Sequence, residues 1–482
     1  MVNVADVANN SLGVGTGTAL LLGAVLGPGV LVLPRLAAEA AGPASVLAWA
    51  GLLALSVPVA VTFATLGARH PDGGGVASFA ARAFGRRTST AVGLWFYCAV
   101  PIGMPAAAMI GGDYVAQSAG LGHLAAVLVA CLLLAAAFAA NAAGLRTSGR
   151  LQLGLVCLLV LLIVAAIAVS APHLRATGFQ PFAPHGVLGV ARAAGVLLWA
   201  FAGWEAVTYL SVEFAGARGG LPWATRITLA VVGVLYLGLA ICTVGVPAAT
   251  ASRVPLTALL SSGIGAAARP ITGIAALFLT FGAMNAYVAG ASRLGAALAR
   301  DGVLPRRLVD EAAPGETPQR SLALLAVLSV LTTVPALVWS IDLDILMRMT
   351  SACLAAVLVV GVAAAARLLP PGHPRRTAAA ATVFCCAALA CCGLYLLLPA
   401  LLALIPALTR GRSAPAQAAP GRFSPYGSGD SDGSDGSDGS GGQVGEAGAE
   451  GRRTVRGEVA VQAQAGDAAV RVDVQADVAD LG

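Results

Sequence analysis

Long apolar runs separated by short polar segments dominate the first 408 residues. A helix that crosses a bilayer needs about 20 mostly apolar residues. Suitable segments lie at 12–41, 44–68, 92–118, 123–144, 150–172, 187–214, 224–248, 269–298, 320–340, 343–367 and 377–408. Gly393 divides the last stretch into two short helices, which gives about twelve spans, whereas one long tilted helix would give eleven. Twelve is favoured because it keeps both termini on one side of the membrane.

A Gly-Pro-Gly sequence interrupts the first apolar segment. Gly27-Pro28-Gly29 lies at the centre of the run from Ala19 to Leu33. Proline removes a backbone donor, and glycine tolerates almost any backbone conformation. Unpaired backbone costs several kcal/mol in hydrocarbon, so a break persists only where it lines a cavity or is buried in protein. We therefore expect a broken helix at this position.

A second break-prone stretch, Phe201–Glu205, lies about half a membrane domain later and includes Ala202 and Gly203. Two interrupted segments at matching positions of two halves are the best sequence indication of a transporter binding site. The sequence therefore predicts an all-α polytopic membrane protein whose first and sixth spans are broken near mid-membrane.

The first break offers groups for both ends of a zwitterion. A helix that restarts at Gly29-Val30 has unpaired N–H groups and a positive dipole end, which suit a carboxylate. The carbonyls of Val25 and Leu26, which end the first half-helix, suit an ammonium group. The alternative is a proline kink that serves packing alone.

Composition excludes a soluble protein. Hydrophobic residues make up 58% of the chain and charged residues 11%, against about 45–50% and 25% in soluble domains. All 29 basic residues are arginine. With the N-terminus inside, fifteen arginines fall in inner loops and four in outer segments, which predicts cytoplasmic termini in the cytoplasmic membrane. The N-terminal segment has no basic residue before the first apolar run, so we expect no cleaved signal.

The composition changes at residue 409. Pro, Gly, Ser and Asp dominate 409–482, which has seven arginines and eleven acidic residues from Arg410 onward. Such a segment cannot form a core. We expect a transmembrane domain at 1–408 and a disordered cytoplasmic tail at 409–482.

Few polar side chains lie inside the predicted spans. Glu205 is an intramembrane carboxylate and therefore a candidate for gating or proton uptake, the alternative being a carboxyl group that bonds freed backbone. Asn285 could serve a site or join helices. Trp199 could cover a ligand or belong to the core. Arg348 is expected to extend towards the membrane surface. The nine cysteines lie in apolar runs without metal-ligand spacing, so we expect no metal and no cofactor.

Four stretches together resemble the amino acid–polyamine–organocation (APC) superfamily, and within it bacterial exporters of L-methionine and branched-chain amino acids. They are GAVLGPGVLVLP at 23–34, HPDGGGVASFAARAFG at 70–85, LLWAFAGWEAVTYLSVEF at 197–214 followed by LPWA, and ALARDGVLP at 297–305. The resemblance covers roughly residues 10–408. It implies a five-plus-five inverted repeat with helices 1 and 6 unwound.

The resemblance also implies roles for individual residues. Carbonyls of Val25, Trp199 and Ala202 would bind the substrate ammonium, and amides near Gly27 and Gly29 its carboxylate. Trp199 would match the aromatic lid and Glu205 the glutamate of the sixth helix.

The chain departs from its relatives in two ways. Pro28 replaces a common Ser or Thr, which shifts the carboxylate towards Gly29 and Val30. The lysine that many relatives carry in the fifth span is absent.

The residues around Met104 favour an apolar substrate. Pro101–Pro105 is apolar where a carrier of cationic amino acids has a polar amide. We therefore predict a secondary transporter of neutral amino acids, with methionine and branched-chain export favoured and an antiporter mechanism expected, rather than an enzyme. Its partners would be the amino acid and the bilayer, not nucleic acid, with homo-oligomers left open. The alternatives are a solute-sensing receptor on a transporter scaffold, or a permease for other amino acids or polyamines.

Overall fold

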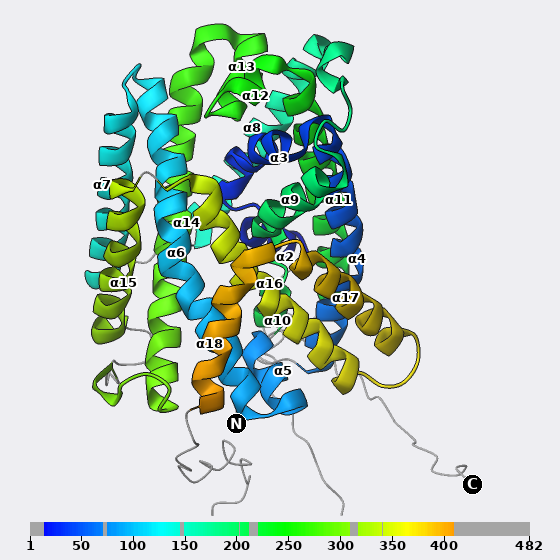
Figure 1. The fold of residues 1–482 in the computed structure, drawn as a ribbon, viewed down its shortest axis with the longest axis vertical. Helices are drawn as coiled ribbons and strands as arrows, with labels where there is room; N and C mark the ends of the chain where they lie inside the picture. The colour runs from blue at the N-terminus through cyan, green and yellow to red at the C-terminus, as the bar shows by residue number, and fades with distance from the viewer. Residues whose placement is uncertain are drawn as a thin grey trace, which may run out of the picture. The chain divides into compact units, whose positions relative to one another are not determined.

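The computed structural model describes residues 14–70, 75–144, 149–201, 203–211, 220–308, 317–339 and 341–408. Every regular element in these ranges is a helix, as predicted (Figure 1). Residues 409–482 lie outside the described part, so the disorder of the tail stays a prediction.

The first span is broken at the predicted position. Helix α2 (Val14–Val25) ends before Gly27, a 3₁₀ turn η1 (Pro28–Leu31) follows, and α3 (Leu33–Ala41) completes the span. Gly27 is extended, with φ −82° and ψ 178°, and Pro28 occupies the first position of the turn, where its missing N–H costs no hydrogen bond.

The second predicted break is also present. Helix α9 (Gly186–Leu197) passes into a 3₁₀ turn η5 (Leu198–Phe201), and a short helix α10 (Ala206–Leu210) follows after a turn at Gly203–Glu205. Both broken segments of the predicted fold are therefore confirmed, while the five-plus-five repeat remains an expectation.

Most of the remaining helices are long and continuous. They are α4 (Ser45–Arg69), α5 (Gly75–Phe84), α6 (Arg86–Ser118), α7 (His123–Ala142), α8 (Gly149–Ser170), α11 (Gly220–Gly245), α14 (Ala268–Arg300), α15 (Gln319–Val338), α16 (Leu343–Leu368), α17 (His373–Ala390) and α18 (Leu397–Leu408). Short 3₁₀ turns join several of them, at Gly42–Ala44, Ala171–His173, Ala176–Phe179, Gly265–Ala267, Arg306–Leu308 and Gly393–Leu396.

Within the described residues, nine helical segments are long and apolar enough to cross a membrane, and a bent pair raises the number to ten. The pair is 373–390 and 393–407, and the helix axis bends by 115° between them. The prediction of twelve spans differs in two ways. It counts the broken first span as a span of its own, although its half α2 has only twelve residues, and it counts the two arms of the bent pair as two spans. The chain is thus a multi-pass membrane protein.

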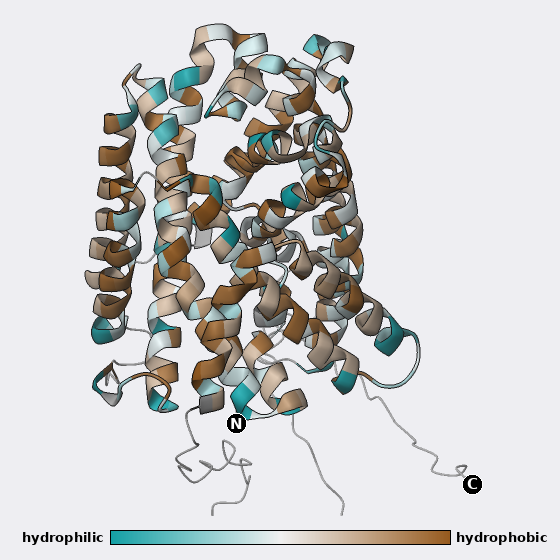
Figure 2. Ribbon diagram, viewed as in Figure 1, coloured by the Kyte–Doolittle hydropathy of each residue, from teal (hydrophilic) through white to brown (hydrophobic). Residues whose placement is uncertain are grey.

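Helix α6 lies at the centre of the helix packing. It contacts α7, α14 and α16, while α11 packs against α2 and α4 (Figure 1). Helices α7 and α15 lie at one edge of the bundle and are largely apolar along their length (Figure 2). Leu124, Leu128 and Leu132 on α7 are exposed by 62–73%, as expected for side chains that face lipid.

Two short helices lie between α11 and α14. They are α12 (Pro247–Ala251) and α13 (Pro255–Ile264), in a region for which the predicted spans, 224–248 and 269–298, specified no structure. Prolines at their first turns fit helix starts. The segment packs against α8 and α14, where Thr257 and Thr272 share a hydrogen bond of 2.7 Å.

Close contact between α6 and α7 generates a prediction. A Cβ at Gly112 would collide with the backbone oxygen of Ala126, so Gly112→Ala requires a backbone shift. We expect a loss of about 1–3 kcal/mol in the free energy of unfolding, seen as a lower midpoint of thermal unfolding in detergent. Gly51→Ala is the control, because nothing lies within 4 Å of a Cβ there. Equal midpoints for the two variants would contradict the packing.

Candidate functional site

Among the described residues, the Gly29 amide is free at the first break. The N–H of Gly27 donates to Val25 O at 3.0 Å, and the N–H of Val30 donates to Gly27 O at 3.2 Å. The Gly29 N–H has no acceptor among these bonds. Of the amides expected to bind a carboxylate, Gly29 is therefore the one that remains available.

Two tyrosine hydroxyls bond carbonyls on either side of the break. Tyr236 on α11 donates to Val25 O at 2.9 Å, and Tyr114 on α6 donates to Leu31 O at 2.8 Å. Both tyrosines are 2% exposed. The Tyr114 bond satisfies a carbonyl that has no other donor among the described residues, whereas the Tyr236 hydroxyl is a second donor to Val25 O beside the Gly27 N–H. They also occupy Val25 O, which was expected to bind the substrate ammonium.

The second break packs directly on the first. Gly203 has φ +128°, a conformation that favours glycine. A Cβ at Gly203 would collide with Ala24 O and come within 2.9 Å of Val25 Cα. Glycine is therefore required both by the backbone conformation and by the close approach. Ala202, expected to offer a carbonyl here, lies outside the described residues.

Glu205 closes the turn of the second break. Its Oε2 accepts a hydrogen bond of 2.9 Å from the Gly203 N–H, and the side chain is 6% exposed. Thr208 Oγ1 donates to the Glu205 carbonyl at 2.6 Å. The carboxyl group thus bonds freed backbone, which was one of the two roles considered for it.

A small chamber of about 50 Å³ lies between the breaks and α6, and we call it the break chamber. A water needs about 10–15 Å³ of such space, so the chamber holds a few waters. Five predicted site residues besides Met104 line it, namely Val25, Gly27, Gly29, Val30 and Trp199. Leu26, Gly203 and Glu205 line a neighbouring cavity instead.

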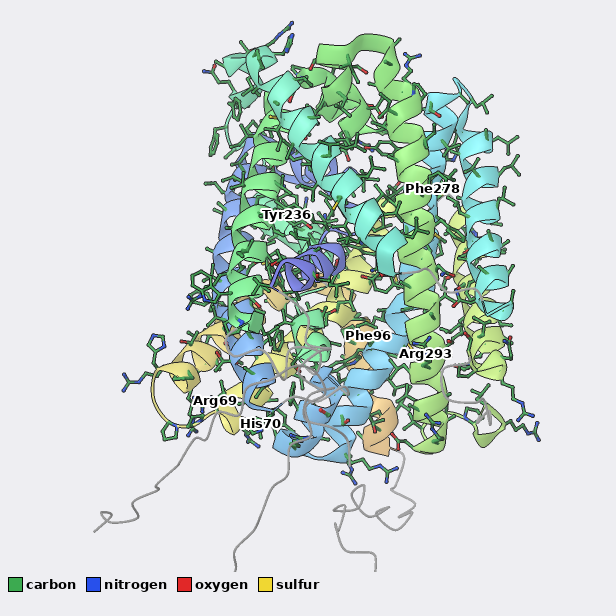
Figure 3. All side chains as sticks on the ribbon, turned by 180° about the vertical axis from the view of Figure 1, so that it is seen from behind. Arg69, His70, Phe96, Tyr236, Phe278 and Arg293 are labelled. Carbon is green, nitrogen blue, oxygen red and sulfur yellow. The ribbon has the colours of Figure 1, made fainter. Side chains whose placement is uncertain are left out.

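The chamber wall carries no charged side chain among the described residues. Its polar side-chain groups are the hydroxyls of Tyr236, Tyr287 and Thr350 and the indole N–H of Trp199. Tyr236 on α11 and Phe96 on α6 line it from different helices, and Figure 3 labels both residues. The apolar side chains are Val25, Val30, Leu33, Phe96, Ala99, Val100, Met104, Ala107, Trp199, Ala200, Ala283, Met284 and Leu354.

The neighbouring cavity, of about 270 Å³, is called the Glu205 cavity. It is lined by α2, α8, α10 and α14, with Gln152 and Glu205 among its polar side chains. Gly27, Pro28, Phe96, Ala283 and Tyr287 line both cavities. Phe96 and Tyr287 therefore form part of the wall that separates them.

A third cavity, of about 930 Å³, is rich in charge and is called the charged vestibule. Its ionisable residues are Arg35, Glu39, Asp113, His123, His185, Arg192, Arg253, Asp342, Asp344 and Arg348. Arg35 pairs with Glu39, and Arg348 pairs with Asp344 at 2.6 Å.

The expected position of Arg348 at the membrane surface is wrong. The residue is 9% exposed, and its Nη1 donates to the carbonyl of Arg192 on α9 at 2.6 Å. Because Asp344 and this carbonyl both bond the guanidinium, the charge is satisfied without leaving the protein.

Asn285 does not line the break chamber. Asn141 Nδ2 on α7 donates to Asn285 Oδ1 on α14 at 2.7 Å and to the Asn285 carbonyl at 3.2 Å. This geometry corresponds to the helix-joining role that was considered for buried amides.

Sequence reasoning missed the aromatic and hydroxyl side chains that complete the chamber. Phe96, Tyr236, Tyr287 and Thr350 lie on four helices distant in sequence. A tyrosine inside an apolar span, such as Tyr236, was the available signal, because a buried phenol usually finds a hydrogen-bond partner.

The Tyr236–Val25 bond generates a prediction. Tyr236→Phe leaves Val25 O with a lone pair free, which should destabilise the empty protein by about 1–3 kcal/mol. An ammonium group can then take the position, so we expect leucine to raise the thermal unfolding midpoint more in the variant than in the parent. Tyr97→Phe, buried on α6 outside the chamber, is the control. A smaller leucine effect in Tyr236→Phe would contradict this role.

Several known membrane transporters are similar in sequence to this chain. The sequence pattern of the amino acid permease family matches residues 12–413. An uncharacterized amino acid permease, YecA of Bacillus subtilis, is 34% identical over 342 residues, which is 70% of this chain and 81% of the relative. The L-methionine/branched-chain amino acid exporter YjeH of Escherichia coli is 30% identical over 59% of this chain and 68% of its own. An uncharacterized transporter of Mycobacterium tuberculosis, Rv1999c, is 27% identical over 64% and 69%.

All of the described helices fall inside the matched range, including both broken segments and every residue that lines the break chamber. This chain is a transporter and belongs to the amino acid permease family.

Proposed function

We propose that the protein carries neutral amino acids with apolar side chains, such as methionine, leucine, isoleucine and valine, across the cytoplasmic membrane. The observation that supports this proposal best is the uncharged wall of the break chamber. Burying a charged side chain there without a partner costs several kcal/mol. A zwitterion with an apolar side chain brings only its two backbone charges, which the breaks can bond.

The substrate carboxylate is proposed to accept from the free Gly29 N–H. The helix dipole at the start of η1 favours a negative charge at this point. The ammonium group is proposed to bond the carbonyls of Val25 and Leu26 at the end of α2, in competition with the Tyr236 hydroxyl. The apolar side chain then lies towards Met104 and Met284.

The order of the cavities supports alternating access. On α6, residues between Phe96 and Ala107 line the break chamber, and residues between Pro105 and Asp113 line the charged vestibule. The Glu205 cavity reaches only Phe96 on the same helix. The chamber therefore lies between two larger spaces, as a carrier that opens to each side in turn requires. Glu205 is proposed to gate the cavity that bears its name.

Export is proposed as the direction because the name of the E. coli relative describes an exporter of this substrate class. We further propose that both termini, including the tail at 409–482, face the cytoplasm. The asymmetric distribution of arginine among the predicted loops supports this orientation.

The direct test is exchange of labelled leucine and methionine in proteoliposomes, with and without a pH gradient. We expect exchange by the parent and its loss in Gly29→Leu, because any side chain at Gly29 would meet the Trp199 indole. We expect a loss of at least tenfold in Glu205→Ala. Gly51→Leu is the control, since a Cβ there has open space around it.

Each outcome of the exchange experiment decides one part of the proposal. Stimulation by the pH gradient supports proton coupling, and its absence contradicts a proton-linked role of Glu205. Binding of leucine without exchange contradicts a carrier and supports a solute sensor. Absence of both binding and exchange overturns the proposed substrate class.

The apolar wall gives a second prediction. Met104→Asn places a buried amide against the substrate side chain at a cost of about 1–3 kcal/mol, so kcat/KM for leucine and methionine should fall roughly tenfold or more. Met109→Asn, on the same helix but in the charged vestibule, is the control. An unchanged ratio between leucine and a polar amino acid such as serine would contradict the placement of the side chain.

A further inference from the structure

We propose that Gly103 on α6 is a positioning residue that fixes the closed position of the Trp199 indole. The inference rests on the proposed function, because it assigns the indole the task of covering the substrate. It adds a residue that acts on the substrate site through the lid.

The two ends of the indole lie against two glycines. A Cβ at Gly29 would come within 2.7 Å of Trp199 Nε1, on the five-membered ring. A Cβ at Gly103 would come within 2.9 Å of Trp199 Cη2, at the far end of the six-membered ring. The ring therefore spans the distance between the first break and α6, and it fits only because neither position has a side chain.

Thr350 closes the third side of this slot. The same Cβ at Gly103 would lie 3.1 Å from Thr350 Cγ2 and 3.2 Å from its Oγ1. Thr350 is 4% exposed, and its hydroxyl donates to the Leu346 carbonyl at 2.9 Å. The threonine is thus fixed on α16 and cannot easily move away from an added methyl group.

Glycine is required at position 103 because no space is left for a side chain, not because of the backbone conformation. The residue lies inside the helix Arg86–Ser118, where it has no positive φ. Glycine costs about 1 kcal/mol relative to alanine in a helix interior. Carbon–carbon contacts normally measure about 3.5–4.0 Å, so a methyl group at 103 would displace the indole by roughly 0.6–1.1 Å.

Displacement of the indole should weaken closure over the substrate. Trp199 belongs to η5, immediately before the second break, so its position connects that break to α6 and α16. A gap of about 0.5–1 Å forfeits a quarter to a half of the van der Waals attraction between two groups, so a displaced indole would hold the substrate less tightly. We expect Gly103→Ala to raise KM for leucine exchange at least tenfold, with a smaller change in kcat.

A double-mutant cycle with Trp199→Phe tests the slot. Phenylalanine is shorter than tryptophan and lacks the atom that meets position 103. Gly103→Ala should therefore raise KM at least tenfold when position 199 is Trp and less than twofold in the Trp199→Phe background. Gly233→Ala on α11, where a Cβ has nothing within 4 Å, controls for helix propensity. An equal rise in KM in both backgrounds, or no rise in KM when position 199 is Trp, would overturn the proposal.

Thermal unfolding of the same four proteins gives a readout that needs no substrate. The slot predicts that Gly103→Ala lowers the unfolding midpoint more in the Trp199 background than in the Phe background, where only the contact with Thr350 remains. Additive midpoints would overturn the slot. Non-additive midpoints without amino acid binding would keep the slot and refute the proposed function, so the two failures are distinguishable.

Discussion

Backbone carbonyls freed by a helix break must find donors inside the protein, and most of the site follows from this constraint. In an apolar surrounding each unsatisfied group costs several kcal/mol. Tyr236 and Tyr114 supply the donors for Val25 and Leu31 from two different helices, and the Glu205 carboxyl group bonds the freed Gly203 N–H at the second break. The Gly29 N–H stays without an acceptor among the described residues. The Gly29 donor is thus left available between two stabilised helix ends, which is the chemistry that a substrate carboxylate requires.

Glycine at a few positions makes the rest of the arrangement possible. Gly203 lets the second break approach the end of α2, and Gly29 and Gly103 leave room for the Trp199 indole. The breaks and the indole therefore meet in a chamber with little spare volume. A small, apolar space favours a small zwitterion over a charged side chain, which agrees with the proposed neutral amino acids. The larger cavities beyond it are lined in part by charged side chains.

Local sequence predicted the breaks because their causes are local. Gly27-Pro28-Gly29 cannot continue a helix, and the stretch around Gly203 also contains a residue that favours a helix break. The tyrosine bonds could not be predicted, since 211 residues separate Tyr236 from Val25 and 83 separate Tyr114 from Leu31. Arg348 was misjudged for the same reason, because its partner carbonyl lies 156 residues away. Hydropathy alone also missed α12 and α13, which are too short to span a membrane.

A structure of the protein with bound leucine, determined by electron cryo-microscopy in a lipid nanodisc, tests the central claim most directly. The account predicts ligand density in the break chamber, with the carboxylate within hydrogen-bond distance of the Gly29 amide and the side chain towards Met104. It also predicts that Trp199 stays between Gly29 and Gly103. Ligand density in the charged vestibule alone, or a carboxylate bonded to an arginine there, would contradict the claim that the two breaks form the substrate site.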